Sequence, residues 1–469
     1  MTRIGAIDQG TTSTRILVAE GDHLEIVASL RHTTQHPRPG WVEQDALEIS
    51  DNIERCVAAA GQLDAIGLAN QGESCIAWDA VTREPLSPII VWQDSRTASS
   101  LLTMGPGATE MAALIAHLPL DAYFSASKLG WLMREVPKVR AAYRAGRLRL
   151  GTTDAFFLDR LAGRFVTDRA TASRTSLMDF ETGEWDPSLC ALFGVPIECL
   201  PPIQPNIGDF GSIAGLPVRA SIVDQQAALY GHDLREPGDL KITFGTGAFA
   251  LALSDGPVRL DAAGGLLPTV AWDLGTRRAF AVDGGVYDAG SVVEWAIRAG
   301  FASGVADFQT FEAPAAIERG LVFVPAFSGL AAPEWDRTAA PVILGLAPDM
   351  TKRDLCQALL EGIALSTAEV CDVMRNAVTL GSMVSIDGGL SQSPYFAQFL
   401  ADSLQMDVLV RHFADRSALG VAQLVAQDQG MPLIRTKVDL DVRFSPKPVS
   451  VAGRELFRRA RSRARDWRL

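Results

Sequence analysis

The sequence lacks the marks of a secreted or membrane-spanning protein. Its six cysteines, at 56, 75, 190, 199, 356 and 371, form no C-x-x-C pair, which predicts reduced, mostly buried thiols. No apolar run reaches the roughly 18 residues that cross a bilayer. The first residues, Met1-Thr2-Arg3-Ile4, lead into a strand pattern without a signal peptide. We therefore expect a cytoplasmic protein with no membrane partner.

Several familiar sequence motifs are also absent. There is no G-x-x-x-x-G-K-[ST] loop, no protein-kinase signature set and no G-x-S-x-G elbow. A basic excess is missing too: 43 Lys and Arg stand against 55 Asp and Glu, a net charge of −12 that argues against nucleic acid as a partner. His32 and His36 have helical spacing, but Pro37 places them in a loop without a third ligand, so we expect no metal there.

Two similar hairpins open the two halves of the chain. Apolar runs at 4–7 and 16–19 flank the Asp8-Gln9-Gly10 turn, and runs at 240–244 and 249–253 flank Gly245-Thr246-Gly247. An apolar strand at 384–386 ends in Asp387-Gly388-Gly389. The length of 469 residues allows two or three domains. The repetition predicts a duplicated α/β architecture, with domains at 1–233 and 234–469 divided near the Pro-Gly turn of 231–239.

Amphipathic helices are expected between the strands. The spacing of apolar residues predicts helices at 351–374, 129–139 and 290–299. Alternation of strands and helices favours α/β sheets. The Pro- and Gly-rich segment 201–217 reads as a long surface connection. The arginine-rich end, 454–469, reads as a solvated terminal helix rather than a partner-binding one.

The hairpin turn after Asp8 has the composition of a phosphate-binding turn. Glycine allows close backbone approach, Thr11, Thr12 and Ser13 offer hydroxyls, and Arg15 offers positive charge. Asp8 could hold Mg²⁺ directly or through water. Alone, the same pattern is more typical of an ordinary hairpin, whose turn residues are chosen for conformation. The second Gly/Thr turn, at Gly245 and Thr246, favours a pair of phosphate clamps.

Asp224 is the best candidate for a catalytic base. It follows the apolar Ser221-Ile222-Val223 run and precedes Ala227-Ala228-Leu229, which places it at a strand-to-helix junction. A carboxylate there can take the proton of an attacking hydroxyl. A helix N-cap aspartate would look the same in sequence.

These residues resemble one family along nearly the whole chain. The sequence is similar to the FGGY carbohydrate kinases, and within them to the glycerol kinases. The matching stretches, in chain order, are 8–13, 40–45, 70–73, 90–93, 123–125, 167–168, 172–175, 224–229, 244–247, 325–330, 333, 335–336 and 387–389.

The resemblance implies a two-domain α/β fold of the actin and hexokinase (ribonuclease H-like) type, with the active site in the interdomain cleft. It implies ATP and Mg²⁺ as cofactors, Asp224 as the base, and Asp8 with Asp224 near the metal. The acceptor residues it implies are Glu73, Trp92, Tyr123, Asp224, Gln225 and Phe249. The nucleotide residues it implies are Thr11, Thr12, Ser13, Arg15, Gly245, Thr246, Gly290, Glu294, Gly388, Gly389 and Ser393.

At three positions in or near these predicted sites, the residue differs from the one typical of glycerol kinases. Gly72 stands where glycerol kinases have an arginine, Glu294 replaces a glutamine and Ser393 replaces an asparagine. No clear fructose-bisphosphate loop precedes Asp224. Losing the arginine removes hydrogen-bond donors and a partner for Glu73, which favours a polyol larger than glycerol. Alternatively, another side chain or water fills the gap and glycerol is the substrate.

Together these features predict ATP-dependent phosphorylation of a hydroxyl of a small polyol. One alternative is a ketose (pentulose) kinase of the same family, and a second is a catalytically silent sensor that binds sugar or nucleotide. Retention of Asp8 and Asp224 argues against the sensor. The sequence itself does not indicate an oligomeric state; dimers or tetramers are usual for relatives, so the resemblance allows a homodimer or homotetramer.

Overall fold

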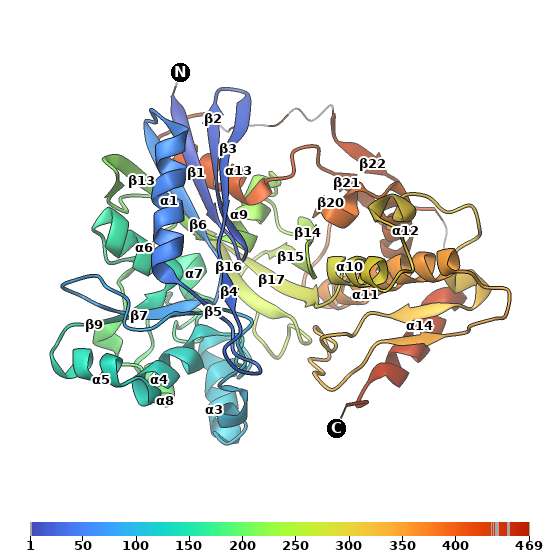
Figure 1. Ribbon diagram of the computed structural model, residues 1–469, viewed down its shortest axis with the longest axis horizontal. Helices are drawn as coiled ribbons and strands as arrows, with labels where there is room; N and C mark the ends of the chain where they lie inside the picture. The colour runs from blue at the N-terminus through green and yellow to red at the C-terminus, as the bar shows by residue number, and fades with distance from the viewer. Residues whose placement is uncertain (1, 433, 435, 437–439, 448–450, 469) are drawn as a thin grey trace. The chain divides into compact units, whose positions relative to one another are not determined.

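The computed structural model describes residues 2–432, 434, 436, 440–447 and 451–468. The chain forms two compact units (Figure 1). Unit 1 comprises Met1–Asp233, Pro268–Phe280 and Asp415–Thr436. Unit 2 comprises Leu234–Leu267, Ala281–Ala414 and Lys437–Leu469. Each unit is therefore assembled from three separate stretches of the chain.

Unit 1 is built on a six-stranded sheet with the order β12-β13-β6-β1-β2-β3. The strands are β1 (Arg3–Gln9), β2 (Ser13–Glu20), β3 (His23–Arg31), β6 (Ala65–Asn70), β12 (Ser212–Ile213) and β13 (Leu216–Val223). Strands β1 and β2 form the antiparallel hairpin that the sequence predicts. Strands β1, β6 and β13 run parallel, so their carboxyl ends meet at one edge of the sheet.

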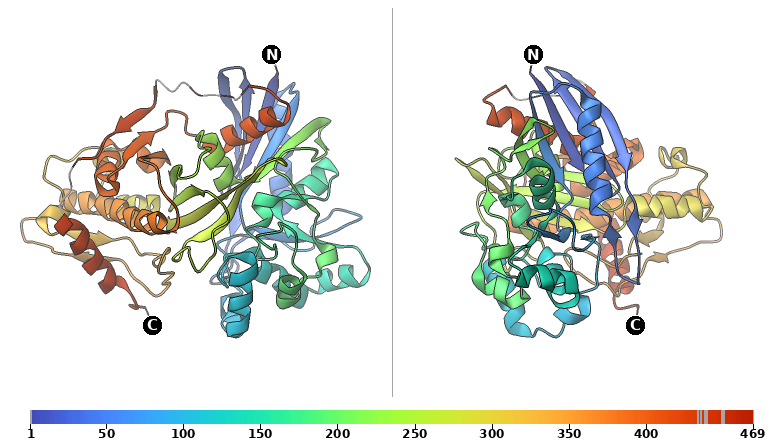
Figure 2. Two further views of the ribbon diagram at one scale, coloured as in Figure 1. Left: turned by 180° about the vertical axis from the view of Figure 1, so that it is seen from behind. Right: turned by 60° about the vertical axis from the view of Figure 1, so that its left-hand side comes forward.

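One face of this sheet is covered by α1 (Ala46–Ala60), which runs along the strands in Figures 1 and 2. Ile7 and Ile16 lie opposite each other in the β1–β2 hairpin and share an apolar cluster with Ile53 of α1. All three side chains are fully buried. Burial of this size stabilises the sheet by about 2 kcal/mol per large side chain.

The other face packs against α13 (Arg416–Asp428). A Cβ placed on Gly67 would lie 2.5 Å from Val421 of α13, so only glycine lets the helix approach this closely. Gly67 pairs with Ala6 of β1. Because side chains alternate along a strand, Asp8, two residues further on, lies on the α13 face as well.

A second, five-stranded sheet of unit 1 has the order β4-β5-β8-β7-β9. Its strands are β4 (Thr34–Gln35), β5 (Glu43–Gln44), β7 (Cys75–Asp79), β8 (Ile89–Ile90) and β9 (Leu148–Thr152). The single helix predicted at 129–139 is wrong. The chain forms α4 (Ser125–Glu135) and α5 (Pro137–Arg144), broken at Val136 with ψ 108° because proline disfavours a helical conformation in the residue before it.

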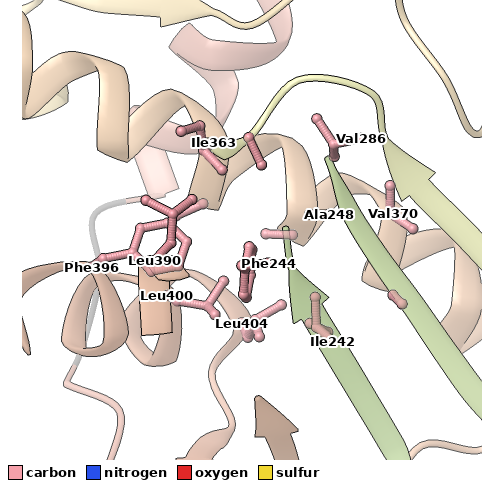
Figure 3. Packing of buried hydrophobic residues seen from close by; sticks show 14 of the residues in the cluster. Ile242, Phe244, Ala248, Val286, Ile363, Val370, Leu390, Phe396, Leu400 and Leu404 are labelled. Atoms are coloured by element: carbon pink, nitrogen blue, oxygen red, sulfur yellow. The ribbon is translucent and has the colours of Figure 1, made fainter. Parts of the chain in front are cut away.

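Unit 2 contains the second hairpin and most of a seven-stranded sheet with the order β16-β17-β15-β14-β20-β21-β22. The strands are β14 (Leu240–Phe244), β15 (Ala248–Ser254), β16 (Leu267–Asp273), β17 (Arg278–Val286), β20 (Met383–Gly388), β21 (Asp407–Val410) and β22 (Val442–Phe444). Figure 3 shows its core, where Phe244 packs beside Phe396 with ring centroids 4.8 Å apart.

Two helices predicted from the sequence, at 290–299 and 351–374, are present in unit 2 as α10 (Gly290–Arg298) and α11 (Lys352–Ala377). Unit 2 also contains α12 (Pro394–Leu404). Thr351 and Asp354 form a capping box that starts α11. Within the part of the chain that the structure describes, no helix combines the length and apolarity needed to cross a membrane.

The two central sheets repeat one topology. In unit 1, β1 pairs antiparallel with β2 and parallel with β6, which in turn pairs parallel with β13. In unit 2, β14 pairs antiparallel with β15 and parallel with β20, which pairs parallel with β21. The duplicated α/β architecture expected from the hairpins is therefore present.

Two further expectations need correction. The terminal segment is not simply a solvated helix: α14 (Val451–Ala464) buries Phe457 and Ala460, and Arg461 is ion-paired with Glu334. Leu469 lies outside the described residues. The segment 201–217 is not a plain surface connection either, because β11 (Ile203–Gln204) pairs with β10 (Thr167–Asp168) and β12 pairs with β13.

Candidate active site

The carboxyl edge of the unit 1 sheet gathers the predicted residues. Asp8 pairs with Ala69 in the β1–β6 register, and Val223 pairs with Asn70 in the β13–β6 register. The chain leaves the sheet at this edge as the Gly10 turn, as residues 71–73 and as Asp224. In open α/β sheets, ligands bind at the carboxyl ends of parallel strands. Strand pairing therefore brings three distant sequence motifs to one place.

The turn after Asp8 is held from several sides. Gly10 N donates to Ser13 O at 3.0 Å within the turn. The carbonyl of Thr11 accepts from Gln44 Nε2 at 2.7 Å and lies 2.9 Å from His32 Nε2. The hydroxyl of Thr11 accepts from Trp92 Nε1 at 3.1 Å. Burial lowers the pKa of His32. The backbone of the turn is thereby fixed while Thr12 stays exposed.

Asp8 and Arg15 lie directly opposite each other in the hairpin. Asp8 is half-buried, and burial raises its pKa to about 6, an effect that the Arg15 guanidinium opposes. Arg15 Nη1 forms an ion pair with Asp415 Oδ1 at 2.8 Å. Asp415 also raises the pKa of Asp8. Arg15 is thus ion-paired with one carboxylate and interacts electrostatically with a second beside the turn.

Glu73 has a cationic partner even though residue 72 is glycine. Arg174 Nε lies 2.6 Å from Glu73 Oε1, and both side chains are buried, with 3% and 6% of their surface exposed. Ser125 Oγ donates to the Glu73 carbonyl at 3.0 Å. Glu73 itself has a φ of 55°, a left-handed conformation uncommon outside glycine. The expected loss of a partner for Glu73 is therefore wrong.

Gly72 lies close to the strand that carries the predicted base. A Cβ on Gly72 would lie 2.9 Å from Val223 Cγ2, one residue before Asp224. The Gly72 carbonyl accepts from Ser74 N at 2.6 Å. Any side chain at this position would have to displace Val223. The glycine is thus built into the packing beneath Asp224.

Two further acceptor candidates of unit 1, Trp92 and Tyr123, lie beside the Glu73–Arg174 ion pair. The rings of Trp92 and Tyr123 meet edge to face with centroids 5.8 Å apart, and the Arg174 guanidinium lies 5.8 Å from the Tyr123 ring. Lys128, fully buried, donates from Nζ to the Tyr123 carbonyl at 2.8 Å. An aromatic wall beside a fixed carboxylate suits a ligand with a carbon backbone and hydroxyls.

Asp224 lies at the strand-to-helix junction, as predicted. It is the first residue of α9 (Asp224–Gly231), and its Oδ1 accepts from Gln225 N at 2.7 Å. The N-cap position belongs to Val223, so the alternative of an N-cap aspartate does not describe this residue. Asp224 and Gln225 are both half-buried.

In unit 2, as in unit 1, a hairpin turn lies beside the turn that follows a neighbouring parallel strand, but the side chains there are different. Phe244 pairs with Gly388, so the Gly245 turn and the Gly389 turn leave adjacent strand ends. Gly290 N donates to Gly245 O at 3.0 Å, and Ser291 N donates to Thr246 O at 3.1 Å, which joins the start of α10 to the hairpin turn. Gly245, Thr246 and Gly389 are exposed.

Three further predicted residues also lie in unit 2. Glu294 is exposed on α10. Phe249 is half-buried on β15. Ser393 is turned inward: its hydroxyl donates to Phe308 O at 2.7 Å and caps α12 by accepting from Phe396 N. Its side chain therefore has a structural role in the helix start.

A magnesium ion fits the carboxylates of unit 1. Among the described residues, no three His, Cys, Asp or Glu side chains group as a metal-binding cluster. Mg²⁺ needs no such cluster, because it usually takes one or two carboxylates together with phosphate oxygens and water. Asp8 and Asp224, both half-buried at the same sheet edge, are of that type.

Four residues of this site were missed by sequence reasoning. Gln44 and Arg174 lie in stretches that resemble the family, so their motifs pointed to them without indicating their contacts. His32 was considered only as a metal ligand, and it braces the turn instead. Asp415 carries no sequence signal, because its partner Arg15 is 400 residues away.

Comparison with known proteins gives the same family along the whole chain. Residues 3–231 match the N-terminal domain, and residues 240–427 the C-terminal domain, of the FGGY family of carbohydrate kinases. The chain belongs to this family, which confirms the resemblance, and it is accordingly a phosphotransferase with an alcohol group as acceptor.

Individual relatives agree over nearly full length. A glycerol kinase of Thermus brockianus is 37% identical, with 98% of each chain covered, and one of Haloferax volcanii is 34% identical, with 99% and 98% covered. The structure of Plasmodium falciparum glycerol kinase with ADP superposes with a TM-score of 0.88 at 27% identity, covering 99% and 98%. A xylulose kinase of Lactobacillus acidophilus, at 20% identity with 98% and 96% covered, shares the fold with a TM-score of 0.84.

Proposed function

We propose that this chain transfers the terminal phosphoryl group of ATP to a primary hydroxyl of a small polyol, with glycerol as the preferred acceptor. The observation that carries the proposal is the convergence of Asp8, Glu73 and Asp224 at the carboxyl ends of three adjacent parallel strands. The full-length similarity to glycerol kinases supports the choice of acceptor.

Asp224 serves as the base. Its half-buried carboxylate accepts from Gln225 N and lies at the sheet edge where the acceptor is proposed to bind. As the hydroxyl oxygen attacks phosphorus, its proton passes to Asp224, the bond from phosphorus to the ADP oxygen breaks, and ADP leaves with that electron pair. The products are the polyol phosphate and ADP.

Glu73, with Trp92, Tyr123 and Gln225, orients the acceptor. The Arg174 ion pair keeps the Glu73 carboxylate fixed, so it can accept hydrogen bonds from hydroxyls without reorganising. The rings of Trp92 and Tyr123 cover the carbon backbone. Phe249 of unit 2 is proposed as the remaining acceptor contact. Because Glu73 has a cationic partner in Arg174, the glycine at residue 72 is compatible with glycerol as acceptor.

The two Gly/Thr turns bind the nucleotide phosphates through backbone N–H groups and hydroxyls. Thr11, Thr12, Ser13 and Arg15 act from unit 1. Gly245, Thr246, Gly290, Glu294, Gly388 and Gly389 line the nucleotide side in unit 2, whereas the buried Ser393 side chain caps α12. Asp8 and Asp224 would hold Mg²⁺, which when bound neutralises phosphate charge during transfer.

The test is acceptor-dependent ADP release from Mg-ATP, measured with glycerol, erythritol, threitol, ribitol, xylitol, arabitol, xylulose and ribulose. We expect glycerol to give the highest kcat/KM. Asp224→Asn should lower kcat about 100- to 10,000-fold with little change in ATP binding. Asp186→Asn is the control: this N-cap of α8 (Pro187–Phe193) can be replaced by asparagine without loss.

Two results would contradict the proposal. Turnover of Asp224→Asn equal to that of the unaltered enzyme would remove Asp224 as the base. A higher kcat/KM with a longer polyol or a ketose would show that Gly72 marks a pocket adapted to that acceptor.

A further inference from the structure

Arg15 lies between two carboxylates that belong to different parts of the chain. It stands directly opposite Asp8 in the β1–β2 hairpin, so both side chains lie on the same face of the sheet. Its guanidinium is nonetheless paired with Asp415, at 2.8 Å from Nη1 to Oδ1. Arg15 is 43% exposed and Asp415 is 24% exposed, so a ligand at this edge can reach both.

The position of Asp415 is fixed by helix packing. Asp415 immediately precedes α13, and its side chain makes no capping hydrogen bond to that helix. Helix α13 packs tightly on α9, because a Cβ on Gly420 would lie 1.8 Å from the Ala227 carbonyl. Helix α9 begins at Asp224. The same helix pair thus fixes the proposed base and the carboxylate that holds Arg15.

We propose that Asp415 is a positioning residue for nucleotide binding, which keeps Arg15 directed at the phosphates and away from Asp8. This inference rests on the proposed function. Without the Asp415 carboxylate, Arg15 would still face Asp8, which lies directly across the hairpin and interacts with it electrostatically. An Arg15–Asp8 pair would remove both a phosphate contact and a carboxylate for Mg²⁺.

If Asp415 had a purely electrostatic role, its removal would change the nucleotide affinity in the opposite direction. If Asp415 acted only as a negative charge near the phosphates, its removal would reduce repulsion and tighten nucleotide binding. If it positions Arg15, its removal weakens binding. The direction of the change in affinity therefore separates the two roles.

The experiment is calorimetric titration of the full-length protein with Mg·AMP-PNP, together with steady-state kinetics. We expect Asp415→Asn to raise the Kd about 5- to 30-fold, the loss of a charge-assisted contact. It should also shift the Mg²⁺ dependence of turnover to higher concentration. The acceptor KM should stay within about twofold, and Asp415→Glu should restore most of the affinity. Asp415→Ser, another good N-cap residue, repeats the test if the asparagine variant is unstable.

Two further variants serve as controls. Asp428→Asn breaks an ion pair of similar length, 2.7 Å to Arg219, at the other end of the same helix, and should leave the Kd unchanged. In an Arg15→Ala background, Asp415→Asn should add less than about twofold, because the two residues act as one unit.

An unchanged or lower Kd for Asp415→Asn, or an effect that persists fully without Arg15, would overturn the inference. These outcomes are distinct from failure of the proposed function, in which the unaltered protein itself would not bind Mg·AMP-PNP or phosphorylate any polyol.

Discussion

Arg174→Met is the substitution that tests most directly how much the buried ion pair with Glu73 contributes to stability and to acceptor binding. The change removes the cation 2.6 Å from Glu73 while keeping a long apolar side chain against Tyr123 and Phe124. Both members of the pair are buried, so the carboxylate cannot turn to solvent. Lys128, whose pKa is lowered by burial, also interacts electrostatically with Glu73.

The expected loss in free energy of unfolding on Arg174→Met is large for the removal of a single ion pair. Removing one partner of a buried pair costs about 3–5 kcal/mol, because a charge is left uncompensated in a poorly polarisable environment. For a unit of this size, that lowers Tm by roughly 6–20 °C. Arg55→Met is the matched control, since the Arg55–Asp51 pair of α1 is 58% and 63% exposed, and surface pairs contribute about 0–1 kcal/mol.

The assay combines thermal unfolding with acceptor kinetics. Arg174→Met should raise the KM for glycerol more than the KM for ATP, because in the proposed function Glu73 orients the acceptor and not the nucleotide. Adding Glu73→Gln should recover most of the lost Tm, since the uncompensated charge is then gone, without recovering the acceptor KM. If the double variant is as unstable as Arg174→Met alone, the cost lies in packing and the reasoning about the ion pair is wrong.

Two other predictions concern the scaffold. Gly420→Ala should lower the free energy of unfolding by at least about 1–3 kcal/mol, because the added methyl group would lie 1.8 Å from the Ala227 carbonyl. Thermal unfolding measures this loss. Gly107→Ala is the control, because a Cβ at Gly107 would have nothing within 4 Å. Burial and the neighbouring Asp154 raise the pKa of Asp168 to about 7, above its unfolded value of 3.8. The stability that this group contributes is present below pH 3.8 and is lost as pH rises towards 7, so Asp168→Asn should flatten the fall of Tm over this window; an unaltered slope would contradict the assignment.

Local patterns predicted the elements that surround the site. The Asp8 and Gly245 turns were recognised because glycine and small hydroxyl residues interrupt two apolar runs, a signal contained within a few residues. Asp224 was placed at a strand-to-helix junction for a similar reason. Helix α11 was predicted from apolar spacing alone, and its cap at Thr351 follows the capping-box pattern.

Contacts between distant segments were not predictable in the same way. The Arg174–Glu73 pair joins residues 101 positions apart, and the Arg15–Asp415 pair joins residues 400 apart. No local pattern encodes such partners, because they depend on which helix packs on which face of the sheet. The absence of an arginine at residue 72 was visible in the sequence, whereas the pairing of Glu73 with Arg174 was not.

The duplicated topology explains why the two units carry different chemistry at equivalent places. Both sheets place a hairpin turn and the turn after a neighbouring parallel strand at one edge. In unit 1 that edge carries half-buried Asp8 and Asp224 and the fixed Glu73, groups that can move a proton or hold a cation. In unit 2 it carries exposed Gly245, Thr246 and Gly389, which suit close approach of a nucleotide to the backbone. Under the proposed function, acid–base chemistry is therefore expected from unit 1, and substitutions at the unit 2 edge should change nucleotide affinity before they change the chemical step.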